Sequence, residues 1–89
     1  MEGYVVKKEG KTMFVDIGSE KRIRKGSKCV AFREVGDLFH PKTGEFLQKE
    51  VMRLGELQVD QVLEKVSRVE VVDEEPGRDI QVGDKVVVK

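Results

Sequence analysis

Short apolar stretches separated by glycine-containing polar turns recur along the whole chain. Alternation of apolar and polar positions over such lengths is typical of β-strands, and their regular spacing is typical of a sandwich or barrel. We therefore expect an all-β fold, a small barrel of about six mostly antiparallel short strands, in one domain over residues 1–89. The expected strands are Gly3–Lys8, Thr12–Ile17, Lys28–Val35, Phe46–Val59, Arg68–Asp73 and Asp84–Lys89.

Alternation within these strands also predicts which side chains point into the barrel. We expect Val30 and Phe32 to point inward and Arg33 outward, and the remaining phenylalanines also stand where a core would use them. Truncation of Phe32 to alanine is accordingly expected to cost about 3–5 kcal/mol. The complete expected core is Val15, Ile17, Val30, Phe32, Leu57, Val59, Ile80 and Val86.

Two places interrupt the simple alternation. Met52 and Leu54 share one face, whereas Leu57 lies an odd number of positions further on, so the sequence predicts a β-bulge or bend near Gly55. Apolar residues within Val59–Lys65 recur at helical spacing, and a short helix is an alternative there. A strand followed by a turn is preferred, because the segment is barely two turns long and poorly capped.

A short phrase occurs twice in the chain. Residues 23–30 and residues 80–87 both have the pattern Ile-x-x-Gly-polar-Lys-x-Val. We expect each isoleucine to fill the core, each glycine to form a positive-φ turn, and a strand to begin at each lysine. This assigns a structural turn to Gly83 and Asp84.

The stretch LFHPKTGEFL, residues 38–47, contains the only histidine. Pro41 presets φ, Thr43 continues the turn, and Gly44 suits the left-handed conformation that closes a four-residue hairpin loop. This register places His40 opposite Glu45, and it pairs Phe39 with Phe46 and Leu38 with Leu47. We therefore interpret His40 as a residue that flanks a turn.

Composition and charge add little that points to a particular ligand. Hydrophobic and charged residues each make up 38% of the chain, and the formal net charge is zero. Residues 1–49 contain 11 Lys/Arg and 7 Asp/Glu (+4), whereas residues 50–89 contain 6 and 10 (−4). No stretch has the apolar length of a membrane span, and the first residues lack a signal-peptide pattern. We expect a small soluble protein or a domain from a longer chain.

The sequence offers no catalytic constellation. Cys29 is the only cysteine, and we interpret it as a small buried thiol that forms no dyad with His40. No serine is marked as a nucleophile, and no phosphate-binding loop occurs. The acidic run at residues 73–75 is interpreted as a solvated loop in preference to a weak cation site. We therefore expect a non-enzyme without a metal or other cofactor.

The best argument for nucleic acid is a basic run between two glycines. Lys21, Arg22, Arg24, Lys25 and Lys28 follow one another closely, and small barrels do bind single strands through basic grooves and stacking aromatics. The chain has no tryptophan and one tyrosine, so stacking partners are scarce. A nucleic-acid-binding barrel that uses the loop Lys21–Lys28 is therefore the alternative function.

Taken in order, the segments resemble a known family. The residues that match include Val15-Asp16-Ile17-Gly18, Cys29-Val30-Ala31-Phe32-Arg33, Pro41-x-Thr43-Gly44-Glu45, Leu54-Gly55-Glu56-Leu57-x-Val59 and Ile80-x-x-Gly83-Asp84. This pattern resembles the C-terminal domain of flagellar assembly protein T, a small β-barrel domain that is also appended to other bacterial envelope proteins. The most specific part is Pro-x-Thr-Gly-Glu followed at a fixed distance by Leu-Gly-Glu-Leu-x-Val.

The resemblance implies a non-catalytic structural domain that binds other proteins in a periplasmic or envelope assembly. The candidate interaction residues are Lys21, Arg22, Arg24, Lys25, Arg68 and Glu70. The last two belong to the strand Arg68–Asp73, whose alternating charges would protect a free edge if the barrel were incompletely closed. An internal antiparallel strand with outward-facing charges is an equal alternative.

Overall fold

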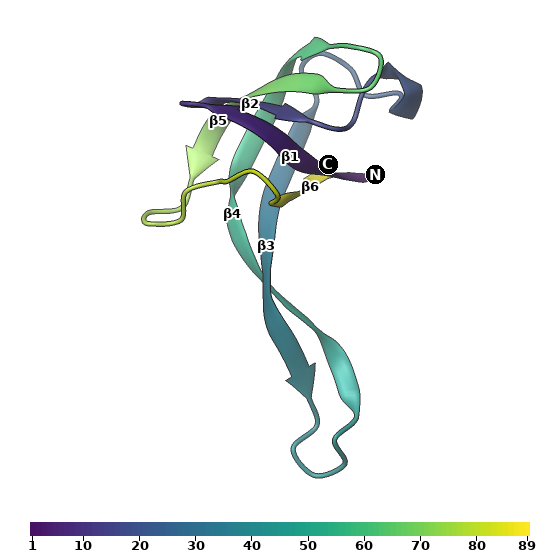
Figure 1. Cartoon of the computed structure of the whole chain (residues 1–89), viewed down its shortest axis with the longest axis vertical. Coiled ribbons are helices and arrows are strands. Elements are labelled where there is room, and N and C mark those ends of the chain that lie inside the picture. The colour runs from purple at the N-terminus through teal and green to yellow at the C-terminus, as the bar shows by residue number, and fades with distance from the viewer.

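Six antiparallel strands form one sheet that closes into a ring in the computed structural model, which describes all 89 residues (Figure 1). The strand order around the ring is β1-β2-β5-β4-β3-β6, with β6 pairing back to β1. The elements are β1 (Glu2–Glu9), β2 (Thr12–Val15), β3 (Lys28–Phe39), β4 (Phe46–Val62), β5 (Ser67–Glu74), β6 (Lys85–Val88) and a 3₁₀ turn, η1 (Ser19–Lys21). The expected all-β, six-stranded antiparallel architecture is confirmed.

The lengths of β3 and β4 are the main departure from expectation. β6 pairs with β3 only from Cys29 to Phe32, and β5 pairs with β4 only from Gly55 to Val62. Beyond those points the two strands pair with each other alone and leave the barrel as a long twisted hairpin (Figure 1). Residues 34–51 of this hairpin are called the arm below.

The arm accounts for the shape of the molecule. The principal extents are 48 × 30 × 18 Å and the radius of gyration is 14.5 Å. A compact chain of this length would have a radius of gyration of about 12 Å. All arm residues except His40 are exposed, so the barrel alone contains the core.

Thirteen apolar side chains fill the barrel. Six of the eight expected core residues are among them: Val15, Ile17, Leu57, Val59, Ile80 and Val86. The expected inward orientation of Val30 and Phe32 is wrong, because Cys29 and Ala31 are the fully buried residues of β3. Apolar residues occupy both faces of this part of the strand, so alternation alone does not show which face points inward. A shift of one residue exchanges the two faces.

No phenylalanine is fully buried. Phe14 and Phe32 are half-buried, while Phe39 and Phe46 are exposed on the arm. The interior is instead filled by medium-sized aliphatic residues and by the small side chains of Cys29 and Ala31. A closed ring of six strands leaves a narrow interior, in which side chains of this size fit.

A bulge occurs where it was expected, next to Gly55. Ala31 lies opposite Gly55 and Phe32 opposite Arg53, so Leu54 is the extra residue of β4. A Cβ atom at position 55 would collide with the carbonyl oxygen of Asp73 on β5. Glycine is required here because the two backbones approach each other too closely for any side chain.

The repeated phrase has the structure that the sequence predicts. Ile23 and Ile80 are both buried, and Gly26 and Gly83 have φ values of 92° and 96°. β3 begins at Lys28, and β6 begins at the equivalent Lys85.

The pairing of β4 and β5 fixes the structure of the segment between them and the position of β5 in the sheet. The segment Val59–Lys65 contains no helix, because β4 continues to Val62 and the chain then turns, with the Leu63 amide donating to the Val66 carbonyl (2.9 Å). β5 pairs with β2 and with β4, so of the two alternatives left open for it, a free edge and an internal strand, the structure shows the internal strand.

Truncation of Leu57, which is fully buried, is expected to destabilise the chain far more than truncation of Phe32. Leu57→Ala should lower the free energy of unfolding by about 2–5 kcal/mol through lost burial and a residual cavity. Phe32→Ala should cost clearly less, because this ring packs on the outside of the barrel. Denaturant titration of both variants tests the assignment, and equal losses would contradict it.

Candidate functional site

The arm concentrates exposed apolar side chains. Twelve large apolar residues of the chain are exposed, and six of them lie between residues 35 and 51. These six are Val35, Leu38, Phe39, Phe46, Leu47 and Val51. Side chains of this kind normally bury against something, so the arm is the most conspicuous candidate surface of the molecule.

The tip of the arm is a closed hairpin loop. The His40 amide donates to the Glu45 carbonyl at 2.8 Å, and the Gly44 amide donates to the His40 carbonyl at 2.9 Å. Gly44 has φ 76°, in the left-handed region that the sequence predicts for it. Phe39 lies opposite Phe46, and their rings meet edge-to-face with centroids 5.9 Å apart.

The register changes by one residue just below this aromatic pair. Leu38 lies opposite Gln48, not opposite Leu47 as expected from the sequence. Leu47 is the extra residue of a β-bulge, and Val35 is the extra residue of another on the facing strand. Each bulge breaks the regular row of hydrogen-bonding groups along one edge of the arm.

The histidine has a conformational role that the sequence only partly indicates. Its Nδ1 accepts hydrogen bonds from the backbone amides of Lys42 (3.1 Å) and Thr43 (3.3 Å). Asparagine and aspartate side chains cap turns in the same way, by accepting from amides further along the chain. The Thr43 hydroxyl accepts in turn from the Glu45 amide at 3.2 Å.

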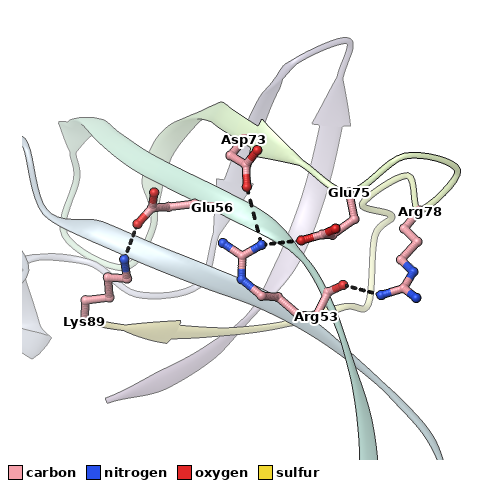
Figure 2. Close-up of polar contacts among 6 residues, drawn as sticks. All are labelled: Arg53, Glu56, Asp73, Glu75, Arg78 and Lys89. Atoms are coloured by element: carbon pink, nitrogen blue, oxygen red, sulfur yellow. Dashed lines mark hydrogen bonds and ion pairs between the residues drawn. The ribbon is translucent and has the colours of Figure 1, made fainter.

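Charged side chains fix the root of the arm against the loop after β5. Figure 2 shows Arg53 reaching Glu75 at 2.8 Å and Asp73 at 3.4 Å, while the Arg78 guanidinium donates to the Arg53 carbonyl at 3.3 Å. The Glu75 amide also donates to the Leu54 carbonyl. The acidic run at residues 73–75 therefore contributes ion pairs and hydrogen bonds to the junction of arm and barrel.

A second clamp holds the loop before β6. Arg33 donates from Nε and Nη2 to the two carboxylate oxygens of Asp84, both at 2.8 Å, and from Nη2 to the Asp79 carbonyl at 2.9 Å. Asp84 is 6% exposed and also accepts from the Gln81 amide. The hydrogen bond to Asp84 raises the pKa of Arg33. The structure thus places Asp84 at the centre of this turn.

The basic loop lies at the opposite end of the barrel from the arm (Figure 1). Ile23 is buried and anchors the loop, while its neighbours Lys21, Arg22, Arg24 and Lys25 are exposed. Arg22 has a positive φ of 61° where η1 ends. None of these four residues, nor Lys28, forms an ion pair, whereas seven other basic residues of the chain do. The loop is the main unpaired cationic surface.

Arg68 and Glu70 lie on β5, which is paired on both sides and therefore has no exposed edge. Arg68 donates from Nε to Asp60 at 2.8 Å, and this hydrogen bond raises its pKa. Glu70 accepts from the Thr12 hydroxyl at 3.0 Å. Both act between neighbouring strands of the barrel, although Glu70 also shares the lining of a depression of about 180 Å³ with Lys25.

Two adjoining depressions lie on the outer surface at the root of the arm. One, of about 200 Å³, is lined by Glu2, Phe32, Val51, Lys85 and Val87. The other, of about 220 Å³, shares Phe32 and Lys85 and is also lined by Tyr4, Arg33, Glu34, Gly83 and Asp84. The outward Phe32, which alternation placed in the core, is the common wall of both.

The groups that could serve as nucleophiles have structural environments. Cys29 is fully buried, burial raises its pKa, and the length of the arm separates it from His40. Ser67 is also fully buried, and its hydroxyl donates to the Ile17 carbonyl at 2.6 Å. No group of three or more histidine, cysteine or acidic side chains is arranged to hold a metal ion.

We expect substitution of Gly44 by valine to open the tip of the arm. A β-branched residue at φ 76° is strained, and the local cost should be at least about 1 kcal/mol. Amide exchange at His40 and Gly44 should accelerate several-fold, while the denaturant midpoint of the barrel stays unchanged. His40→Asp should keep slow exchange, whereas His40→Leu should not. Equal exchange in these last two variants would contradict the capping role.

Removal of the buried carboxylate at position 84 is expected to loosen the loop before β6. Asp84→Ala leaves Arg33 without its bidentate partner and leaves the Gln81 amide without an acceptor. The loss should be about 2–3 kcal/mol, typical of hydrogen bonds to charged groups. Thermal or denaturant unfolding measures it, and Asp79→Ala is the control, because its contact with Arg33 uses the main-chain carbonyl.

Comparison with protein-family models and with curated proteins gives no relative. No family model matches the chain, and no curated protein matches it. No helix of this structure has the length and apolar character needed to cross a membrane.

Proposed function

We propose that the chain is a non-catalytic protein-interaction domain of a bacterial cell-envelope protein, similar in role to the flagellar-assembly domain that its sequence resembles. The observation that carries the proposal is the arm, a hairpin outside the barrel that exposes six large apolar side chains. Specific protein interfaces use aromatic and large apolar anchors of this kind.

The construction of the arm suits a recognition element. Its root is clamped to the barrel by Arg53 and by the Arg33–Asp84 pair, and its tip is closed by the His40 cap. Binding residues held by a stable scaffold lose less conformational freedom when a partner binds. The aromatic pair Phe39–Phe46 is therefore presented in a defined place.

The envelope part of the proposal depends on the sequence resemblance. Its two most specific motifs are Pro41-x-Thr43-Gly44-Glu45 and Leu54-Gly55-Glu56-Leu57. These motifs form the tip of the arm and the bulge at its root. The resemblance and the candidate surface thus involve the same element, which favours an interaction role over a purely structural one.

Site-specific photocrosslinking in cells that express the natural protein tests this function. A photoreactive residue at position 39 should give a protein adduct in the envelope fraction, whereas the same residue at position 63 should not. Leu63 is a suitable control because it is exposed and apolar and belongs to the turn between β4 and β5, which lies at the end of the barrel away from the arm (Figure 1). Adducts found only in the cytoplasmic fraction, or equally strong at both positions, would contradict the proposal.

Nucleic-acid binding is the second candidate function, and the unpaired basic loop is the observation that favours it. We expect the chain to bind a single-stranded oligonucleotide only weakly, and we expect this binding not to depend on the basic loop. Reversing the charges of Lys21, Arg22, Arg24 and Lys25 should leave the fold intact, because these side chains are exposed and form no ion pair. Circular dichroism checks the fold of this variant.

Binding titrations at 50 and 200 mM salt decide between the two functions. Tight binding that falls steeply with salt, and that charge reversal abolishes, would establish nucleic acid as the ligand. Charge reversal that unfolds the chain would show instead that the loop is structural.

A further inference from the structure

We propose that the end of the barrel that carries the basic loop docks on an anionic lipid membrane, and that this contact points the arm away from the lipid. The inference goes beyond the proposed function, because it assigns a second partner to the opposite end of the molecule. Three features carry it: the charge gathered at this end, the fixed surface that presents the charge, and the distribution of charge along the long axis.

Two segments that are distant in the sequence form this end of the barrel. The Ser19 amide donates to the Leu63 carbonyl at 2.8 Å, and the Glu20 amide donates to the Glu64 carbonyl at 3.4 Å. The basic loop and the turn between β4 and β5 therefore lie side by side, away from the arm (Figure 1). Residues 18–28 and 63–66 are together called the basic end below.

The basic end has a large excess of positive charge. It contains six basic residues and two acidic ones, Glu20 and Glu64, which gives a net charge of +4, whereas the whole chain is neutral. All six cations are exposed and none forms an ion pair, so they are free to attract an external anion. They are Lys21, Arg22, Arg24, Lys25, Lys28 and Lys65.

The backbone holds these cations in fixed places. Gly18 approaches the neighbouring turn so closely that a Cβ atom there would collide with the Glu64 carbonyl oxygen. Further along the loop, the Gly26 amide donates to the Val59 carbonyl at 2.8 Å, and Ile23 is buried between these two anchors. A loop attached at three points loses little conformational freedom when it binds.

An extended anionic surface suits this end better than a small ligand. Of its six cations, only Lys25 lines a depression. Clustered lysines and arginines attract the anionic lipids of a membrane, and each one near the surface raises the affinity about five-fold. Leu63 adds an exposed apolar side chain in the turn that is bonded to the loop. Basic and apolar side chains act together in peripheral membrane contacts.

Nucleic acid fits the basic end less well. Proteins that bind single strands combine cations with aromatic side chains on which the bases stack. Residues 16–31 and 47–89, which include the whole basic end, contain no aromatic residue. A lipid surface presents anionic groups without bases and needs no stacking partner. The composition of the basic end therefore favours lipid.

The charge distribution along the long axis sets the orientation. The arm, residues 34–51, contains four acidic and two basic residues, a net charge of −2, and lies at the other end of a molecule 48 Å long. An anionic membrane attracts the basic end and repels the arm when either comes within about 10 Å of it. Docking through the basic end therefore leaves the Phe39–Phe46 pair free for a protein partner.

Co-sedimentation of the purified chain with lipid vesicles tests the proposal. At 50 mM salt, the wild-type chain should bind vesicles of phosphatidylcholine that contain about 30% phosphatidylglycerol. It should not bind vesicles of phosphatidylcholine alone, because these carry no net charge. Binding to the anionic vesicles should fall about ten-fold or more at 500 mM salt, since exposed charges are screened.

Two charge-reversal variants locate the contact. Lys21→Glu/Arg24→Glu should weaken binding to the anionic vesicles at least about 100-fold, because each reversal removes an attraction and adds a repulsion. Lys11→Glu/Lys42→Glu changes the net charge equally, at the β1–β2 turn and the arm tip, and should bind within about two-fold of wild type. All four side chains are exposed and unpaired, so circular dichroism should show the wild-type fold in both variants.

Photocrosslinking on the anionic vesicles tests the orientation. A photoreactive residue at position 63 should form an adduct with lipid, and the same residue at position 39 should not. Lipid adducts at position 39 alone would assign the contact to the arm and overturn the inference.

Four other results would also overturn it. These are no binding to the anionic vesicles, equal binding to neutral and anionic vesicles, equal losses in the two charge-reversal variants, and oligonucleotide binding that is tighter than vesicle binding and that Lys21→Glu/Arg24→Glu abolishes. The last result would assign the basic end to nucleic acid. Failure to bind vesicles, combined with protein adducts at position 39 in the envelope fraction, would remove the membrane contact and leave the proposed function standing.

Discussion

The approach of β5 to Gly55 is the constraint on which the rest of the structure depends. The Asp73 carbonyl occupies the space of a side chain at this position, which only glycine leaves free, and the bulge at Leu54 lies directly beside it. Leu54 then enters the core while Arg53 turns toward the acidic residues of the loop after β5. One close contact thus ends the barrel, starts the arm and supplies the carboxylates that hold its root.

The chain consequently divides two tasks between two regions. The barrel buries thirteen apolar residues and builds its core from aliphatic side chains of moderate size. The arm buries almost nothing and depends on turn chemistry and a few ion pairs for its shape. Residues of the arm can therefore change with little effect on folding, provided that Gly55 and its surroundings are retained.

Local patterns predicted the features that depend on local chemistry. The repeated phrase before β3 and β6, the positive φ of Gly44, the Phe39–Phe46 pair and the bulge near Gly55 each follow from a few neighbouring residues. The orientation of β3 did not follow, because Cys29-Val30-Ala31-Phe32 is apolar on both faces and only the narrow interior selects the smaller pair. The departure of the paired ends of β3 and β4 from the barrel was also missed, since nothing in these strands shows that β6 stops at Phe32. The site was hidden for the same reason: nothing in the residues around Phe39 and Phe46 shows that these side chains lie outside the barrel.

The buried thiol of Cys29 is a natural probe of barrel opening. It lies on the stretch of β3 that pairs with both β4 and β6, and its side chain has no exposed surface. A thiol reagent can reach it only when strands separate, whereas fraying of the arm leaves it covered. The rate at which the Cys29 thiol is labelled therefore measures opening of the barrel alone. It distinguishes movement of the arm from local unfolding of the barrel.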